Sequence, residues 1–119
     1  MSRVPIIKID GILIATVQED LSDREALDFQ MDLNEALEKT GATGVVLDIS
    51  VLETIDSFLG RFLNEIAAGS RLLGAQAVVA GMQPAVAITL VELGLRLRDI
   101  STALTAERGI AMLRRRTLL

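Results

Sequence analysis

A chain of 119 residues, half of them hydrophobic and 24% charged, is long enough to fold as one domain around a buried core and too apolar to be disordered. It contains no cysteine and no histidine, which excludes disulfides, thiolate metal sites, cysteine nucleophiles and serine–histidine catalysis. We therefore expect a protein that is not an enzyme and that needs no cofactor or metal ion.

The net charge of −4 is unevenly distributed along the chain. Thirteen of the sixteen acidic residues lie within residues 1–70, whereas seven of the twelve basic residues, all of them arginine, lie within residues 71–119. Arg114, Arg115 and Arg116 end a predicted helix, where cations complement the helix dipole, and no stacking aromatic residue accompanies them. The sequence therefore does not predict a nucleic-acid partner.

The sequence also predicts no membrane attachment. Acidic residues and a lysine interrupt any apolar segment near the N-terminus, so no signal peptide is expected. Residues 72–91 carry no charge, but Gly74, Gly81 and Pro84 divide this stretch into a strand, a turn and a helix. We expect a cytoplasmic protein.

The chain opens with two apolar, β-rich runs at residues 4–9 and 11–17. The dipeptide Asp10-Gly11 between them is typical of a tight hairpin turn. Pro5 lacks an N–H donor, which indicates that the first strand lies at an edge of the sheet. The sequence therefore predicts an opening β-hairpin.

A capping box marks the start of the first helix. The Ser22 hydroxyl can accept from the Glu25 amide, and the Glu25 carboxylate can reach back to the Ser22 amide. The apolar spacing predicts a helix from there to about residue 39. Its core-facing stripe comprises Ala26, Phe29, Leu33 and Leu37.

The rest of the chain alternates strands and helices. Strands are predicted at residues 44–49, 75–80 and 99–104, and helices at residues 56–73, 85–93 and 105–113. The strand at 44–49 is almost continuously apolar, which is typical of a central strand covered on both faces. Pro84 suits the first position of its helix, Gly94 its end, and Thr105 the cap of the last helix. The order β-β-α-β-α-β-α-β-α predicts a single α/β domain over residues 1–119, with a mixed, mostly parallel sheet and four helices.

A polar turn joins the central strand to the next helix, and Ser57 stands where that helix begins. The Asp56 carboxylate is placed to cap the helix by accepting from the amide of Phe58 or Leu59. A phosphate on Ser57 would meet free amides and the positive end of the helix dipole, although Asp56 and Glu53 would repel it. The residues alone favour a small polar residue at an ordinary helix start over a serine that is phosphorylated, and they leave both interpretations open.

The position of Phe58 bears on this choice. The helical period divides the helix into two faces. The expected core-facing residues are Leu59, Phe62 or Leu63, Ile66 and Leu73. The opposite face comprises Phe58, Arg61, Glu65 and Leu72. An exposed Phe58 beside an exposed serine would indicate a protein interface, but Phe58 could equally tuck under the strand–helix turn.

Asp48 and Asp56 form the one tempting carboxylate pair. Such a pair could bind a metal ion or act as acid and base, but the chain offers no histidine and no third ligand beside them. Neither a P-loop pattern nor a dinucleotide-binding glycine pattern occurs. The sequence therefore does not favour a metal site or nucleotide chemistry here.

The chain resembles a known family in its order of elements and in three stretches. These stretches are Val45-Val46-Leu47-Asp48-Ile49-Ser50, Ile55-Asp56-Ser57 and Thr105-Ala106-Glu107-Arg108-Gly109. Together they resemble the STAS domain, the fold of anti-sigma factor antagonists, over essentially the whole chain. Asp56-Ser57-Phe58 followed by Gly60-Arg61 is most similar to the small stand-alone stressosome members of the RsbS type. Many antagonists carry a small residue after the serine, and Phe58 departs from that pattern.

The resemblance implies a non-enzymatic signalling scaffold. RsbS-type proteins co-assemble with RsbR-type co-antagonists into a large cytoplasmic shell, the stressosome, which holds an RsbT-type serine/threonine kinase. The RsbR type carries an additional N-terminal sensory domain, for which 119 residues leave no room. On stress the kinase phosphorylates the motif serine, here Ser57, and is released, and a PP2C-type phosphatase resets the site. Asp56, Phe58, Gly60 and Arg61 correspond to the partner-binding flanks of that serine.

Two alternatives remain open at this point. A free anti-sigma factor antagonist would bind an anti-sigma kinase directly, without a shell. A small-molecule-binding STAS module, or a minor enzyme that uses Asp48 and Asp56, would instead respond to nucleotides or metal ions.

Overall fold

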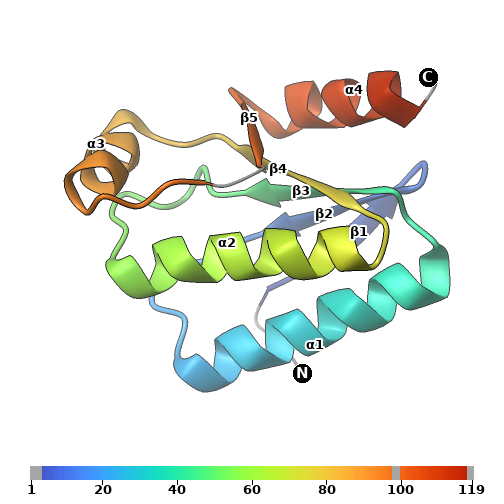
Figure 1. Ribbon diagram of the computed structural model, residues 1–119, viewed down its shortest axis with the longest axis horizontal. Coiled ribbons are helices and arrows are strands. Elements are labelled where there is room, and N and C mark those ends of the chain that lie inside the picture. The colour runs from blue at the N-terminus through green and yellow to red at the C-terminus, as the bar shows by residue number, and fades with distance from the viewer. Residues whose placement is uncertain (1–3, 98–99, 118–119) are drawn as a thin grey trace.

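A five-stranded mixed sheet lies at the centre of the protein, whose computed structural model describes residues 4–97 and 100–117 (Figure 1). The strands are β1 (Ile6–Ile9), β2 (Ile12–Thr16), β3 (Gly44–Asp48), β4 (Gln76–Ala80) and β5 (Ser101–Ala103). They lie side by side in the order β1-β2-β3-β4-β5. β1 runs antiparallel to β2, and the strands from β2 to β5 are parallel to one another.

The turn between β1 and β2 accounts for the antiparallel pair. Asp10 and Gly11 both have a positive φ, 47° and 80° respectively, as the favoured two-residue hairpin turns require. Ile9 pairs with Ile12, so the loop closes directly on the last paired residues. β1 occupies an edge of the sheet, as Pro5 indicated.

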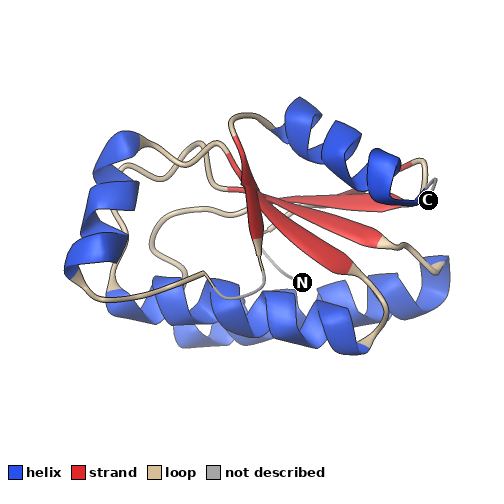
Figure 2. Cartoon of the chain, turned by 45° about the horizontal axis from the view of Figure 1, so that its top comes forward, coloured by secondary structure: helices blue, strands red, loops and turns tan. Residues whose placement is uncertain are grey.

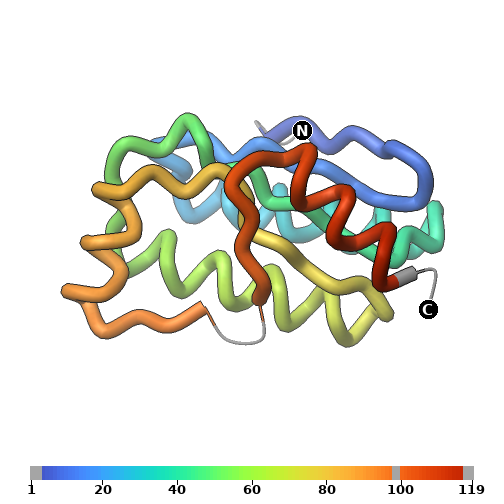
Figure 3. The backbone as a smooth tube through the Cα atoms, turned by 90° about the horizontal axis from the view of Figure 1, so that it is seen from above, coloured from blue at the N-terminus to red at the C-terminus, as the bar shows by residue number. Residues whose placement is uncertain are grey.

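Four helices cover the sheet unequally: α1 (Asp23–Thr40), α2 (Ser57–Leu72), α3 (Pro84–Glu92) and α4 (Ala106–Thr117). α1 and α2 lie on one face, and α4 lies on the other (Figures 1 and 2). α3 stands beyond the end of the sheet, at the same end of the molecule as the start of α2 (Figures 1 and 3). Among the described residues, no helix is both long enough and apolar enough to span a membrane.

Covering both faces buries the parallel strands on both sides. One apolar cluster joins Leu13, Val45 and Val79 of the sheet to the inner faces of α1 and α2. A smaller cluster on the other face includes Val46 and Leu113, the latter from α4. The nearly continuous hydrophobic sequence of β3 follows from this burial on two sides.

The predicted element order, the α/β class and the mixed, mostly parallel sheet are confirmed. Ser22 and Glu25 form the predicted capping box. Most boundaries differ from the prediction by one or two residues, but α4 continues to Thr117. Asp99, which was included in the last predicted strand, lies outside the described residues.

One residue that was predicted to lie in the core is exposed in the structure. The prediction that Leu73 faces the core is wrong, because α2 ends at Leu72 and the chain then turns through Gly74, whose φ is 87°. Leu73 is 50% exposed, and Leu72 is 88% exposed as expected. The helix therefore ends one residue before the position that its apolar period predicts.

Candidate functional site

Ser57 is the first residue of α2 and lies beyond the carboxyl ends of the parallel strands. Asp56 caps the helix: its Oδ1 accepts from the Leu59 amide at 2.8 Å, and its carbonyl accepts from the Gly60 amide at 3.1 Å. The predicted cap is therefore confirmed, and it fixes the direction of the turn that carries Ser57. Open α/β sheets commonly carry their functional groups at the carboxyl ends of the strands.

The Ser57 hydroxyl forms no hydrogen bond with any described residue, and the residue is half-buried. Other serines are already engaged: Ser22 caps α1, Ser70 bonds within α2, and Ser101 bonds to α4. Within residues 4–97 and 100–117, only Ser50 shares this unbonded state of the hydroxyl. The Ser57 Oγ can therefore take a new substituent without first breaking an internal bond.

The surface around the start of α2 is acidic. A cavity of about 150 Å³ lies there, between the loops that precede α1 and α2. The residues that line it are Glu19, Asp20, Leu21, Thr54, Ile55, Asp56, Phe58 and Leu59. The Glu53 amide donates to Glu19 Oε1 at 2.9 Å and ties the two loops together. A phosphate on Ser57 would add negative charge to a region whose side chains are already negative.

Phe58 is half-buried and packs against the larger apolar cluster. Its ring stacks on Phe62, with centroids 6.1 Å apart and 10° between the ring planes. Phe62 in turn meets Phe29 of α1 at 6.1 Å. The sequence left open whether Phe58 is exposed or packs inward. In the structure it packs inward, and only part of its ring is accessible. The aromatic contacts anchor the first turn of α2 to α1.

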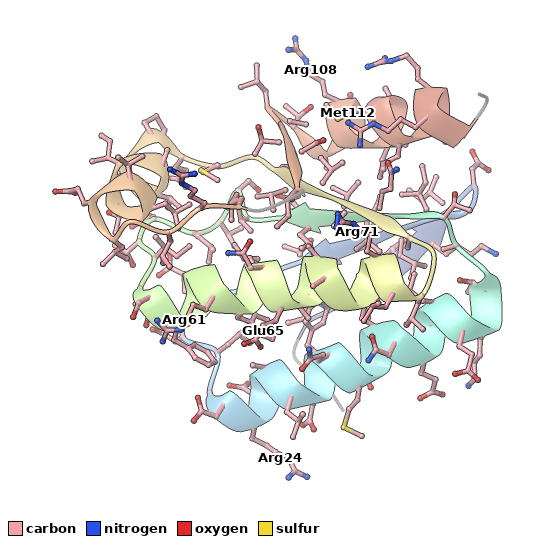
Figure 4. All side chains as sticks on the ribbon, viewed as in Figure 1. Arg24, Arg61, Glu65, Arg71, Arg108 and Met112 are labelled. Atoms are coloured by element: carbon pink, nitrogen blue, oxygen red, sulfur yellow. The ribbon has the colours of Figure 1, made fainter. Side chains whose placement is uncertain are left out.

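The flanking residues Gly60 and Arg61 differ in accessibility. Gly60 is buried, and a Cβ at this position would lie 2.6 Å from Leu95 Cδ1 and 3.2 Å from Leu90 Cδ2. Glycine here lets the end of α3 approach α2 closely, so any effect of Gly60 on a partner is indirect. Arg61 is exposed and points away from the sheet (Figure 4).

The Asp48 and Asp56 carboxylates both bond to nearby backbone. Asp48 Oδ1 accepts from the Ser50 amide at 2.9 Å, just as Asp56 Oδ1 accepts from Leu59. In the part of the chain that the structure describes, no group of three or more acidic side chains is placed to hold a metal ion. Both aspartates therefore stabilise the two ends of the β3–α2 loop.

Two residues that the sequence did not assign to the site hold this loop from the neighbouring β4–α3 turn, although Gly81 was expected in a turn. Gln83 Nε2 donates to the Ser50 carbonyl at 2.8 Å. Gly81 has a φ of 77°, and a Cβ on it would lie 2.8 Å from Ser50 Cβ. A glycine directly after a buried strand was the available signal, but the sequence does not tell which loop it faces.

Comparison with known proteins agrees with this architecture. The STAS domain model matches residues 3–107, and the chain belongs to the STAS domain family. It is 40% identical to a serine-to-glutamate variant of RsbS from Moorella thermoacetica, with a TM-score of 0.85 over 99% of this chain and 100% of that one. A chain from the structure of the stressosome, described as a signal integration and transduction hub, is 39% identical, with a TM-score of 0.84 over 97% of this chain and 100% of that one.

Curated relatives are longer proteins. The RsbT co-antagonist proteins RsbRA and RsbRD of Bacillus subtilis (strain 168) are each 25% identical, over 107 and 108 residues. The chain spans about two fifths of the length of these relatives, 39% in each case. The resemblance to RsbS and to the anti-sigma factor antagonist family that the sequence indicated is thereby confirmed.

Proposed function

We propose that the protein is a non-enzymatic scaffold of a cytoplasmic stressosome that sequesters an RsbT-type serine/threonine kinase and releases it when Ser57 is phosphorylated. The unbonded Ser57 hydroxyl, presented at a capped helix start in a chain 40% identical to RsbS, carries this proposal. The Moorella relative with serine exchanged for glutamate supports it, because a carboxylate imitates part of the charge of phosphoserine. The matches to RsbRA and RsbRD support RsbR-type co-antagonists as partners, and a PP2C-type phosphatase would reset the site.

The chemistry requires nothing catalytic from this chain. The kinase transfers the γ-phosphoryl group of ATP to Ser57 Oγ, ADP leaves, and the hydroxyl proton passes to a base of the kinase. The phosphate adds roughly −1.5 to −2 charges at neutral pH, next to Asp56 and the other carboxylates of the cavity. A kinase surface that fits the neutral serine and the accessible part of Phe58 then meets a hydrated, doubly charged group, and the complex weakens.

Phosphoryl transfer to single-residue variants tests this proposal. Incubation with an RsbT-type kinase and ATP should add one phosphate to the wild type and none to Ser57→Ala, as measured by intact-protein mass. Ser57→Ala should still bind the kinase, whereas Ser57→Asp should bind it on the order of tenfold more weakly or worse, a loss of about 1.4 kcal/mol or more. Ser50→Ala is the matched control, because Ser50 is the other unbonded serine, and it should accept phosphate as the wild type does. Transfer to Ser57→Ala at the wild-type rate contradicts the assignment.

The assembly state separates a stressosome scaffold from a free antagonist. Mixing the protein with an RsbR-type partner should give a particle far larger than either component by analytical ultracentrifugation. A monomer or dimer both with and without that partner would instead favour an anti-sigma factor antagonist that binds its kinase directly.

A further inference from the structure

A polar hollow of about 400 Å³ lies at the N-terminal ends of β4 and β5. Ser57 lies at the other end of the parallel strands. The polar side chains of the hollow come from four elements: Arg71 of α2, Gln76 of β4, Ser101 of β5 and Arg116 of α4. In Figure 4, Arg71 points from α2 towards the sheet. The hollow is about 20 Å along α2 from Ser57, given the rise of an α-helix, so it is separate from the candidate phosphorylation site.

Arg116 is fixed in this hollow by two hydrogen bonds. One of its terminal nitrogens donates to Gln76 Oε1 at 3.1 Å, and the other donates to Ser101 Oγ at 2.7 Å. A guanidinium group has no acceptor, so both oxygens must face it. The planar cation is therefore oriented in advance, and less side-chain entropy is lost when a ligand binds it.

The same bonds leave hydrogen-bond donors for a ligand. Because Gln76 turns its oxygen to Arg116, its amide NH₂ group points the other way, and it forms no bond with the described residues. Ser101 accepts from Arg116 and so retains its O–H. Arg71, which already has an interaction partner, brings a second guanidinium with five N–H donors into the lining, and none of the described lining residues is acidic. Donors and positive charge converge here in a chain whose net charge is −4.

We propose that this hollow, the arginine pocket, binds a small phosphate-bearing anion. Phosphate offers several acceptor oxygens in the geometry that paired guanidinium N–H groups fit. A second hollow of about 220 Å³ adjoins the first and shares Gln76 and Arg116 with it. Gly74 and Leu113 line that second hollow, so the uncharged part of a larger phosphate ester has room beside the phosphate group.

Binding of inorganic phosphate by the full chain tests the proposal. Phosphate is titrated against chloride of equal ionic strength, while NMR follows the Gln76 side-chain amide and the Ser101 backbone amide. The wild type should saturate, and Arg116→Gln and Arg71→Gln should each weaken binding tenfold or more. Arg115→Gln is the matched control: Arg115 is exposed on the same turn, forms no bond with the described residues and lines neither hollow. It should bind phosphate as the wild type does.

A further variant guards against loss of folding, because Arg116 also ties α4 to two strands. Ser101→Ala keeps both guanidinium groups and the bond from Arg116 to Gln76, and it removes one bond to Arg116 together with the Ser101 O–H donor. It should therefore fold normally by circular dichroism and lose affinity a few-fold. The proposal is overturned if the wild type does not saturate or if all variants respond equally. The spectral changes would then reflect ionic strength alone. Tighter binding of a nucleoside monophosphate than of phosphate would show that the ligand extends into the second hollow. Equal affinity would show that the phosphate group alone is recognised.

Discussion

The three arginines at the end of α4 show how side chains of one type take different roles. The sequence predicted only that they complement the helix dipole. In the structure, Arg114 bonds to Asp10 Oδ2 at 2.7 Å and reaches the β1–β2 turn, whereas Arg116 reaches two parallel strands. Arg115 extends from the same turn without a bond to any described residue. Position relative to the sheet, rather than residue type, decides which arginine holds the helix in place.

Gly81 lets the β4–α3 turn approach the loop before Ser57 closely. Gly81→Ala would place a methyl group 2.8 Å from Ser50 Cβ and 3.2 Å from its Cα, at a φ of 77°. The left-handed conformation alone costs an alanine about 1 kcal/mol, and overpacking against the backbone adds about 1–3 kcal/mol. Gly94→Ala isolates the first cost, because Gly94 has a φ of 68° and no atom near its would-be Cβ. Urea unfolding should show the larger loss for Gly81→Ala, and equal losses contradict the contact.

At the scale of elements, the first turn of α2 is held by three separate devices. Asp56 caps it, Phe58 joins it to α1 through Phe62, and Gly60 lets α3 pack against it. A helix start fixed in this way presents Ser57 in one conformation. Under the proposed function, the kinase would therefore have to recognise a helical turn rather than an extended segment.

The cap is the device that can be removed most cleanly. Asp56→Ala should lower the free energy of unfolding by about 1 kcal/mol, because the Leu59 amide loses its acceptor. Asp56→Asn keeps an acceptor oxygen at the same position, so its free energy of unfolding should fall by only a few tenths of 1 kcal/mol. Chemical denaturation with circular dichroism measures both. A loss for Asp56→Asn as large as that for Asp56→Ala would mean that the charge, and not the hydrogen bond, stabilises the turn.

The outer face of α1 carries an exposed ion pair in which Lys39 Nζ donates to Glu35 Oε1 at 2.6 Å. The hydrogen bond and the charge of Lys39 lower the pKa of the Glu35 carboxyl, and the same two effects raise the pKa of Lys39. The stabilisation from Glu35 is therefore present above its ordinary pKa and is lost as the pH falls through the lowered value. The stabilisation from Lys39 is lost as the pH rises through its raised value. Lys39→Gln should return the pKa of Glu35 towards its ordinary value in a ¹³C NMR titration, and an unchanged value contradicts the pair.

At the scale of the whole molecule, the two faces of the sheet are protected unequally. α1 and α2 share one face, whereas α4 alone covers the other (Figure 2). Leu113 is 2% exposed and packs so closely on Gly44 that a Cβ there would lie 2.8 Å from it. Among the described residues of α4, Leu113 is the only hydrophobic side chain that is fully buried against the sheet, and Ala106, Ile110 and Met112 pack around it.

Leu113→Ala should therefore lower the free energy of unfolding by about 2–4 kcal/mol, since a buried leucine leaves a cavity that the rigid strands cannot close. Arg115→Ala, on the exposed side of the same helix, should stay within about 0.5 kcal/mol of the wild type. Urea unfolding followed by far-UV circular dichroism compares the two. A loss below about 1 kcal/mol for Leu113→Ala would mean that α4 is not part of the cooperative core.

The elements were predictable because their signals are local: the capping box at Ser22, the Asp10-Gly11 turn and the apolar period of α1 all act within a few residues. The contacts that shape the two sites are not local. Gln83 and Ser50 are 33 residues apart in sequence, and Arg116 and Gln76 are 40 apart. The cap at Asp56 followed from sequence, but the inward position of Phe58 depends on the packing of α2 against α1. No periodicity within one segment contains that information.

The strand order of the sheet is also the order of the strands in the chain, and this has a consequence for synthesis. Each strand that leaves the ribosome finds its partner already laid down, so the sheet can grow from the first hairpin by one strand at a time without waiting for a distant segment. The helices α1 and α2 arrive early and close their face as it forms. α4 is made after all five strands, and until it docks, Ile12, Val46 and Val78 remain uncovered. The newly made chain therefore exposes one apolar face of its sheet until α4 has been synthesised and has docked.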